Sequence, residues 1–222
     1  MSLSIHEHIY TPSSTRSPRT LLMLHGTGGN EHDLLPLARM LDPEAAVLSP
    51  RGNVLERGMP RFFRRLAEGV FDHEDVARRA AELARWINAA LSHYAIERDG
   101  LTLVGFSNGA NIAAAMMLLR PEGAEHLRSA IFIRAMVPVP AQTSVAEAPA
   151  AGAGRPRVLV LAGARDPIVP ASNSAELAAL LRRRGIETSL EMLHAGHEIT
   201  REDVTLARTW LGAGGAGQAP GA

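Results

Sequence analysis

The stretch Leu101-Thr-Leu-Val-Gly-Phe-Ser-Asn-Gly-Ala110 decides the fold. It opens with a short apolar run of residues that favour strands, and an alanine-rich segment of helical character follows it directly. Between the two lies Gly105-Phe-Ser-Asn-Gly109, which matches the pattern G-x-S-x-G in a strand, turn and helix context. The two glycines carry no Cβ, so the backbone of a sharp turn can pass close to its neighbours. The stretch therefore predicts that Ser107 stands at the carboxyl edge of a sheet and at a helix N-terminus, although a tight turn without chemistry would use the same glycines.

The composition is that of a single globular domain. The chain has 222 residues, of which 46% are apolar, and this is enough for a sizeable core. Its 23 basic and 23 acidic residues give a formal net charge of zero, so nothing indicates nucleic acid or an anionic membrane as a partner. The absence of cysteine excludes disulfides, a thiol nucleophile and thiolate metal sites. The first residues lack a signal-peptide pattern, and the longest apolar run, 112–119, is too short for a membrane span, so we expect a cytoplasmic protein.

Strand and helix patterns alternate along the whole chain. Buried strands are expected over 20–24, 45–49, 101–104, 129–133 with a continuation into 134–138, and 157–162, a strand of alternating type over 187–193, and an edge strand over 5–10. Helices are expected over about 34–41, 74–94, 108–119, 172–184 and 201–211. This alternation predicts an α/β fold with a mostly parallel central sheet and helices on both faces, joined by right-handed crossovers.

The remaining segments define the boundaries of the domain. We expect one domain over residues 1–211 and a flexible Gly/Ala-rich tail over 212–222. Residues 51–74 form a long connection, and long connections in compact domains are often functional. Residues 141–156 are rich in Ala, Gly and Pro and suit a flexible surface loop. No large cap domain is inserted, because the segment between 138 and 157 is short and poor in aromatic residues.

Two later strands are each followed by a residue that a serine nucleophile requires. A serine hydroxyl needs a base to take its proton, and that base needs an acid to orient it. Asp166 follows the strand over 157–162, and His197 follows the strand over 187–193 in a glycine-containing loop. The chain order Ser, acid, His is the one expected on a sheet of this kind. We therefore assign Ser107 as nucleophile, Asp166 as orienting acid and His197 as base.

Other residues compete for two of these roles. Asp166 alone could be an ordinary turn residue before proline or the cap of the following helix. Glu198 and Asp203 are weaker candidates for the acid because they lie at or near the last helix. His194 is the competitor for the base, three residues before His197 and nearer to the strand end.

A glycine-rich loop, His25-Gly-Thr-Gly-Gly-Asn30, follows the strand over 20–24. Acyl transfer places negative charge on the carbonyl oxygen, and fixed donors there are worth several kcal/mol. We expect one donor to be the N–H of Asn108, directly after the serine, and the other to be the N–H of Thr27. His25 is expected to brace the loop by hydrogen bonds. The glycine spacing matches neither a dinucleotide fingerprint nor a P-loop, which disfavours a phosphate site.

Taken together, these motifs resemble the α/β-hydrolases of the carboxylesterase/phospholipase group, which includes the acyl-protein thioesterases and small bacterial serine esterases. The resemblance covers about residues 20–211. It is carried by the glycine-rich loop, the serine motif, Gly163-Ala-Arg-Asp-Pro-Ile-Val-Pro170 and Ala195-Gly-His-Glu198. It implies hydrolysis of carboxylic esters or thioesters through an acyl-enzyme. The elbow has Asn108 where many relatives have Gln, and the loop lacks the Leu-Gly-Asp of the thioesterases, so the bacterial esterase branch is the nearer match.

The substrate is expected to be a small-molecule ester, small or exposed, because the site has no cap. In the long connection, Phe62 and Phe63 are candidates for a pocket wall, and Arg61 or Arg64 could meet an acidic substituent; Met136 is a further pocket candidate. The alternative is that the two Phe side chains belong to the core and the arginines are solvated.

Neither a metal nor an organic cofactor is expected. The rival functions are a serine hydrolase of another bond, such as a lactone or a peptide, and a non-catalytic binding module on the same fold. A homodimer is common among such folds and stays an open alternative.

Overall fold

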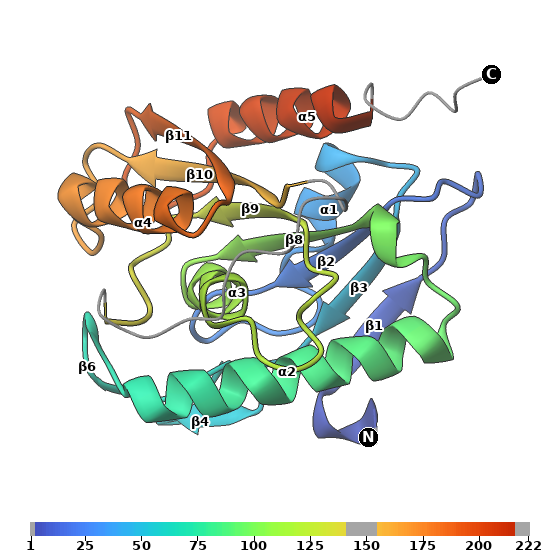
Figure 1. The fold of residues 1–222 in the computed structure, drawn as a ribbon, viewed down its shortest axis with the longest axis horizontal. Coiled ribbons are helices and arrows are strands. Elements are labelled where there is room, and N and C mark those ends of the chain that lie inside the picture. Colours follow the sequence, from blue (N-terminus) through green and yellow to red (C-terminus); the bar gives the residue numbers. More distant parts are fainter. Residues whose placement is uncertain (1–2, 141–154, 216–222) are drawn as a thin grey trace.

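The computed structural model describes residues 3–140 and 155–215, and its centre is a seven-stranded sheet (Figure 1). The strands are β1 (His8–Thr11), β2 (Thr20–Leu24), β3 (Ala46–Pro50), β8 (Leu101–Phe106), β9 (Ser129–Ile133), β10 (Arg157–Gly163) and β11 (Glu187–Leu193). Their order in the sheet is β1-β3-β2-β8-β9-β10-β11. The edge strand β1 pairs antiparallel with β3, and the other pairs are parallel. The predicted mostly parallel sheet is therefore confirmed.

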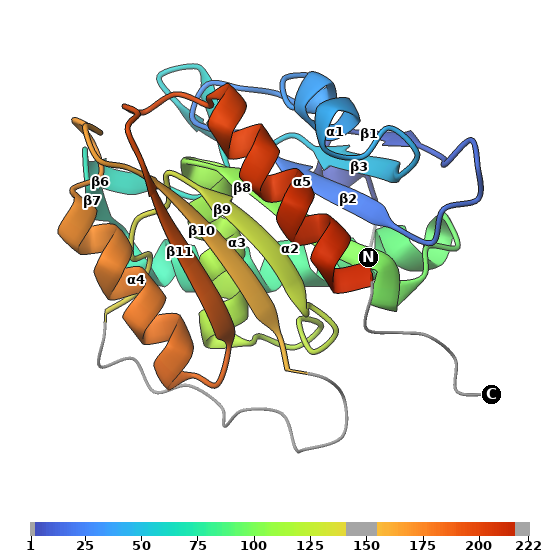
Figure 2. The same ribbon diagram turned by 90° about the horizontal axis from the view of Figure 1, so that it is seen from above.

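Helices cover both faces of the sheet (Figure 2). On one face lie α2 (His73–His93), α3 (Asn108–Leu119) and α4 (Ala171–Arg183), and on the other lie α1 (Leu35–Leu41) and α5 (Arg201–Gly215). Successive strand residues point to opposite faces. Accordingly, Leu22 packs in the core beneath α2 and α3, whereas Leu21 packs in the core beneath α1 and α5. Because both faces are buried, inner strands such as β2 and β10 are apolar runs, whereas the edge strand β11 alternates.

The long connection after β3 contains two small hairpins. They are β4 (Val54–Glu56) with β5 (Met59–Arg61), and β6 (Arg65–Ala67) with β7 (Val70–Phe71). Gly58 and Gly69 stand at their turns with φ of 82° and 71°, a conformation that favours glycine. Two single 3₁₀ turns, Leu3–Ile5 and Arg98–Gly100, complete the described elements.

Four segments differ from the expectation or lie outside the described residues. The predicted continuation of the fifth strand into 134–138 is wrong: β9 ends at Ile133 because Arg134 takes a φ of 56°. The last helix continues past 211 to Gly215, so the first residues of the predicted tail are helical. Residues 216–222, and 141–154 of the predicted surface loop, lie outside the described residues. Within the described ranges, no helix is long and apolar enough to span a membrane.

Candidate active site

Ser107 occupies a strained turn between β8 and α3. Its φ of 50° and ψ of −112° lie outside the regions that most residues adopt, and such strain is typical of functional sites. The turn depends on both glycines of the motif. A Cβ on Gly105 would lie 2.6 Å from the Ala110 Cα, and one on Gly109 would lie 2.0 Å from the Leu24 carbonyl oxygen. The Ser107 N–H donates to the Ile133 carbonyl at 2.9 Å, which fixes the turn against β9.

The structure brings together the three residues that the sequence motifs singled out. His197 Nε2 lies 2.8 Å from the Ser107 hydroxyl oxygen, and His197 Nδ1 lies 2.7 Å from Asp166 Oδ2. A carboxylate can only accept here, so the Nδ1 position carries the proton and Nε2 is left to accept from the hydroxyl. The Asp166 side chain is fully buried, and its Oδ1 accepts the N–H groups of Ile168 and Val169 at 2.8 and 2.9 Å.

The loops that carry Asp166 and His197 are bound to each other. The Ala164 N–H donates to the Leu193 carbonyl at 2.8 Å, and the Arg165 N–H donates to the Ala195 carbonyl at 3.0 Å. A Cβ on Gly163 would lie 2.6 Å from the carbonyl oxygens of Ala195 and Gly196, so this approach requires glycine. The two loops therefore hold one relative position at the carboxyl edge of the sheet.

The competing residues are engaged elsewhere. Asp203 forms a buried ion pair with Arg134, and Glu198 accepts the Gly196 N–H at 3.0 Å. His194 Nε2 lies 3.0 Å from the Arg165 guanidinium. Of the candidates for acid and base, it is Asp166 and His197 that form a hydrogen-bonded chain to Ser107.

His25 braces the glycine-rich loop by two hydrogen bonds. Its Nε2 accepts the Gly52 N–H at 2.9 Å, so the proton is on Nδ1, which lies 2.6 Å from the Gly26 carbonyl oxygen. The ring is 1% exposed, and burial lowers its pKa from the ordinary value of 6.5. A neutral His25 therefore ties the loop to the segment after β3.

The strand β5, which is the second strand of the first hairpin, also holds the glycine-rich loop. The Gly28 N–H donates to the Pro60 carbonyl at 2.9 Å, and the buried Arg61 guanidinium donates to Thr27 Oγ1. Burial lowers the pKa of Arg61 to about 10, a value at which it is still a cation at neutral pH. Thr27 is thus fixed through its side chain and through the backbone beside it.

The two predicted oxyanion donors lie on different elements: Thr27 is in the glycine-rich loop and lines the pocket, and Asn108 is the first residue of α3, directly after Ser107. Among the described residues, neither the Thr27 N–H nor the Asn108 N–H has a protein acceptor. The Asn108 side chain is buried, and its Oδ1 accepts the Phe62 N–H at 2.8 Å. The side chain of Asn108 therefore anchors the hairpin segment, while its backbone N–H is left available.

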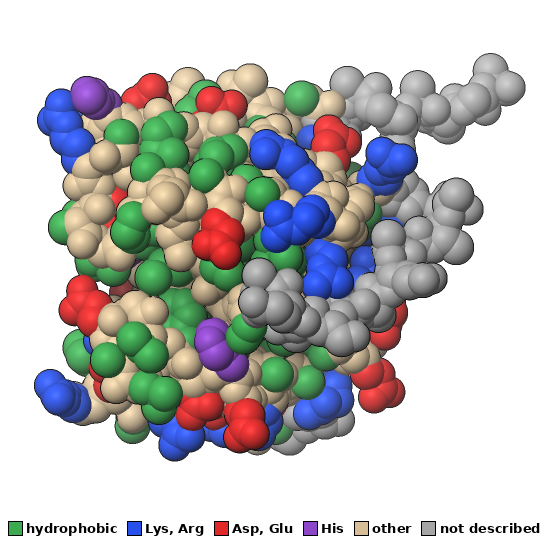
Figure 3. Space-filling model, turned by 60° about the vertical axis from the view of Figure 1, so that its left-hand side comes forward, with side chains coloured by type: hydrophobic (Ala, Val, Ile, Leu, Met, Phe, Trp, Pro, Cys, Tyr) green, Lys and Arg blue, Asp and Glu red, His purple; other side chains and the backbone are tan. Residues whose placement is uncertain are grey.

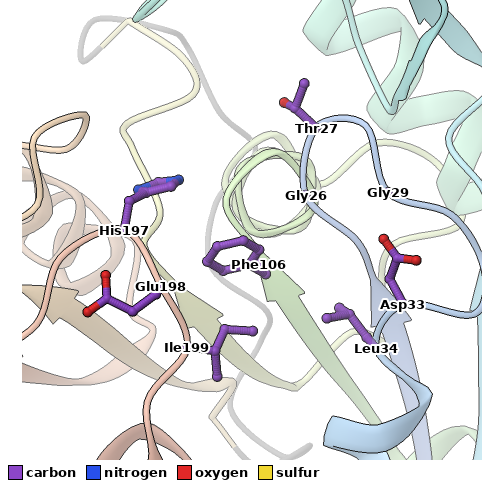
Figure 4. Close-up of a pocket in the computed structure, with 9 residues that line it drawn as sticks. All are labelled: Gly26, Thr27, Gly29, Asp33, Leu34, Phe106, His197, Glu198 and Ile199. Atoms are coloured by element: carbon purple, nitrogen blue, oxygen red, sulfur yellow. The ribbon is translucent and has the colours of Figure 1, made fainter.

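A pocket of about 410 Å³ opens between the glycine-rich loop and the loop of His197 (Figure 4). Its lining residues are Gly26, Thr27, Gly29, Asp33, Leu34, Phe106, His197, Glu198 and Ile199. Figure 4 shows Phe106 between the two loops, with Asp33 and Leu34 on one wall and His197 and Ile199 on the other. Seen from the side of the carboxyl edge, the surface is hollowed and many hydrophobic side chains surround the hollow (Figure 3).

The residues that we expected to bind substrate do not line this pocket. Phe62 and Phe63 are 2% and 0% exposed and belong to the core, as the alternative interpretation had it. Arg64 is exposed and pairs with Asp72, and Met136 packs partly buried against the core. The expectation that Phe62 and Phe63 form a pocket wall is therefore wrong, because both side chains are buried in the core.

The pocket-lining residues Asp33, Leu34, Phe106 and Ile199 were not singled out from the sequence. Phe106 and Ile199 lie within two residues of Ser107 and His197, so their closeness in sequence was the available signal. Asp33 and Leu34 lie a few residues beyond the glycine-rich loop and gave no such signal. In the part of the chain that the structure describes, no group of three or more His, Asp and Glu side chains could hold a metal ion.

Comparison with known proteins identifies the family of the chain. The model of the phospholipase/carboxylesterase family matches residues 6–213. The chain belongs to the phospholipase/carboxylesterase family. It is accordingly a carboxylesterase-like hydrolase, and the α/β-hydrolase fold expected from the motifs is confirmed.

Several known proteins are similar to nearly the whole chain. MhqD of Bacillus subtilis (strain 168), which carries the name of a hydrolase, is 43% identical over 204 residues, covering 92% of this chain and 96% of its own. The carboxylesterase of Bacillus cereus superposes with a TM-score of 0.84 at 43% identity, covering 94% of each chain. YahD, solved with malic acid, superposes with a TM-score of 0.83 at 26% identity, covering 94% of this chain and 98% of its own.

Proposed function

We propose that this protein is a serine esterase in which Ser107 attacks the carbonyl carbon of a carboxylic ester. The hydrogen-bonded chain from Ser107 through His197 to Asp166 is the observation that supports this role. His197 Nε2 takes the hydroxyl proton as the bond to the carbonyl forms. Asp166 holds the imidazole in the tautomer that accepts at Nε2 and stabilises the imidazolium that results.

The negative charge that develops on the carbonyl oxygen is met by the N–H groups of Thr27 and Asn108. His197 then gives its proton to the leaving alcohol, and the acyl group stays on Ser107. A water molecule, deprotonated by the same imidazole, attacks the acyl-enzyme and releases the acid. In this proposal the strained turn of Ser107 keeps the hydroxyl at the helix N-terminus throughout.

Turnover of p-nitrophenyl butyrate tests this proposal. The Ser107→Ala variant removes the nucleophile and creates no clash, so it should keep the circular-dichroism spectrum of the wild type and lose activity by at least about 10³-fold. Retained turnover in a folded Ser107→Ala variant would reject the mechanism.

The substrate is proposed to be a small or exposed ester. The pocket of about 410 Å³ suits a short acyl or aryl group, and its walls supply Leu34, Phe106 and Ile199 as apolar surface. A thioester of similar size is the alternative within the same mechanism. A series of p-nitrophenyl esters from two to twelve carbons should show the highest kcat/KM at about two to six carbons, and a maximum at the longest chains would contradict it.

The charges of the pocket favour a neutral or cationic group next to the ester. Both charged side chains that line the pocket, besides the triad histidine, are acidic: Asp33 and Glu198. The arginines expected to meet an acid are engaged, since Arg61 contacts Glu56 and Arg64 pairs with Asp72. YahD was solved with malic acid, so a dicarboxylate ligand is the competing possibility for this chain.

Two rival functions have their own tests. A lactonase or peptidase would use the same triad, and a panel of lactones and peptides beside the esters separates these activities. A non-catalytic binding protein would leave Ser107 unreactive.

The cytoplasmic location and the homodimer are predictions from the sequence alone.

A further inference from the structure

A buried ion pair lies beneath the loop that carries His197. Arg134 and Asp203 are both 0% exposed, and their side chains form two parallel bonds, Nη1 to Oδ1 and Nη2 to Oδ2, each at 2.8 Å. The hydrogen bonds of the two side chains go to Gly196, Leu161, Thr200 and each other rather than to Ser107, Asp166 or His197. A buried pair of this kind is often no more stabilising than apolar residues of similar volume, so fold stability alone is a weak explanation for it.

The other donors of Arg134 reach two of the segments that build the site. Its Nε donates to the carbonyl of Gly196, directly before His197, at 2.8 Å. Its Nη1 and its backbone N–H donate to the Leu161 carbonyl in β10, at 3.1 and 2.9 Å, and β10 leads to Asp166.

The third segment joins at the residue before Arg134. The Ile133 carbonyl accepts the Ser107 N–H at 2.9 Å. The turn at 133–134, where Arg134 has a φ of 56°, therefore touches the segments of nucleophile, acid and base together.

Asp203 holds the far end of the same loop. Its Oδ2 accepts the N–H and the hydroxyl of Thr200 at 2.7 and 2.8 Å, and its own N–H donates back to the Thr200 hydroxyl at 3.3 Å. This reciprocal cap starts helix α5. The loop from Gly196 to Thr200 is thus bound on both sides of His197 to one ion pair.

We propose that the Arg134–Asp203 pair is a positioning device that sets the distance from His197 to Ser107. The inference rests on the proposed serine esterase function. Loss of the pair releases the Gly196 carbonyl and the Thr200 cap, so the imidazole no longer keeps its 2.8 Å contact with the hydroxyl. A displacement of about 1 Å at reacting groups can cost on the order of 10²-fold in rate.

The double variant Arg134→Met/Asp203→Leu removes both charges and leaves neither buried alone, so it is the variant expected to fold. We expect kcat for p-nitrophenyl butyrate to fall by about 10- to 100-fold with KM changed by less than about 3-fold, because the contact that is lost, from His197 Nε2 to the Ser107 hydroxyl, serves proton transfer, and the apolar walls of the pocket stay in place. A merely structural role would leave kcat unchanged in the folded protein, and that result would overturn the proposal.

The matched control is Arg19→Met/Asp42→Leu. Arg19 and Asp42 form an ion pair at 2.6 Å, and Arg19 also donates to the Leu211 carbonyl of α5 at 3.2 Å, far along that helix from His197. This control removes an ion pair that binds the same helix, and it should leave kcat unchanged. An equal loss of kcat in the control would also overturn the proposal.

Two further measurements cover the remaining outcomes. If the first double variant does not fold, Thr200→Val removes the two cap bonds of the Thr200 hydroxyl without touching a charge and should lower kcat about 3- to 10-fold; no change would overturn the proposal. The proton NMR signal of the hydrogen-bonded His197 Nδ1–H should be present in the wild type and the control and weakened or shifted in the variant. This signal can be measured without turnover. An inactive wild type would therefore reject the esterase function, and the NMR signal would still decide whether the ion pair positions His197.

Discussion

The side-chain oxygen of Asn108 accepts the backbone N–H of Phe62 at 2.8 Å. This bond joins the residue directly after the nucleophile to the hairpin segment 54–71, which the sequence showed only as a long connection. Both partners are buried, at 2% exposure each. The hairpins are therefore fixed to the same turn that presents Ser107.

Replacing Asn108 with Ala should destabilise the protein and leave the nucleophile reactive. The Phe62 N–H would lose its acceptor in a buried place, which costs about 1–3 kcal/mol. The backbone N–H of residue 108 is unchanged. Urea unfolding measures the loss. The control Asn53→Ala removes an exposed amide bonded to Glu82 and should cost less than about 0.5 kcal/mol. Equal stabilities of the two variants would contradict the anchoring role.

Gly109→Ala should disrupt the turn at Ser107. The added Cβ would lie 2.0 Å from the Leu24 carbonyl oxygen, which is backbone and cannot move away cheaply. We expect a loss of more than about 3 kcal/mol in the free energy of unfolding and a loss of ester turnover. The matched control is Gly212→Ala in α5, where no atom lies within 4 Å of the new Cβ and helix propensity should add up to about 1 kcal/mol. A Gly109→Ala variant as stable as the wild type would show that the turn can relax.

Asp33→Asn should change the charge preference for substrates. In the described residues the Asp33 carboxylate has no ion-pair or hydrogen-bond partner, whereas the Glu198 carboxylate is bonded to the Gly196 N–H. The variant should raise kcat/KM for p-nitrophenyl hemiglutarate about 3- to 10-fold relative to p-nitrophenyl valerate, because one negative charge is removed from a partly exposed site. The ratio should change less in Glu198→Gln. A wild type that prefers the hemiglutarate would instead favour the dicarboxylate alternative.

Stability should fall as the pH drops below about 6.5. Burial lowers the pKa of His25, and also of His6 and His126, below the ordinary value of 6.5. The unfolded chain therefore takes up these protons at a higher pH than the folded protein, and the stabilisation present above pH 6.5 is lost as the pH falls through the folded-state pKa values. Urea unfolding at pH 7.5, 6.5 and 5.5 measures the effect. The His25→Gln variant cannot titrate at this position and should show a smaller loss; an identical pH dependence would remove His25 as a contributor.

The sequence predicts the sheet well because its strands are buried on both faces. Continuous apolar runs such as Thr20–Leu24 and Arg157–Gly163 appear at their predicted places within one or two residues. The end of β9 was missed because the left-handed conformation of Arg134 comes from tertiary hydrogen bonds to Leu161 and Gly196 rather than from its residue type.

The pocket was harder to predict than the hydrogen-bonded chain of Ser107, His197 and Asp166. Those three residues follow strand ends, and parallel strands bring their carboxyl ends to one edge. Phe62 and Phe63 lie in a segment with no helical or strand periodicity of apolar residues. The sequence therefore did not distinguish a position in the pocket wall from a buried position in the core. Asp33 lies between the glycine-rich loop and α1, and the path of the chain there directs it to the pocket. That path is set by the tertiary structure and has no local sequence pattern.

The most direct test of the central claim is labelling of the native protein with a fluorophosphonate probe, followed by peptide mass spectrometry. We expect stoichiometric modification of Ser107 in the folded wild type, no modification after urea unfolding, and labelling slowed by at least about 10²-fold in His197→Ala, since the hydroxyl is activated through His197. A folded wild type that is not modified at Ser107, or one that is modified equally fast without His197, would contradict the claim that these residues form a catalytic triad.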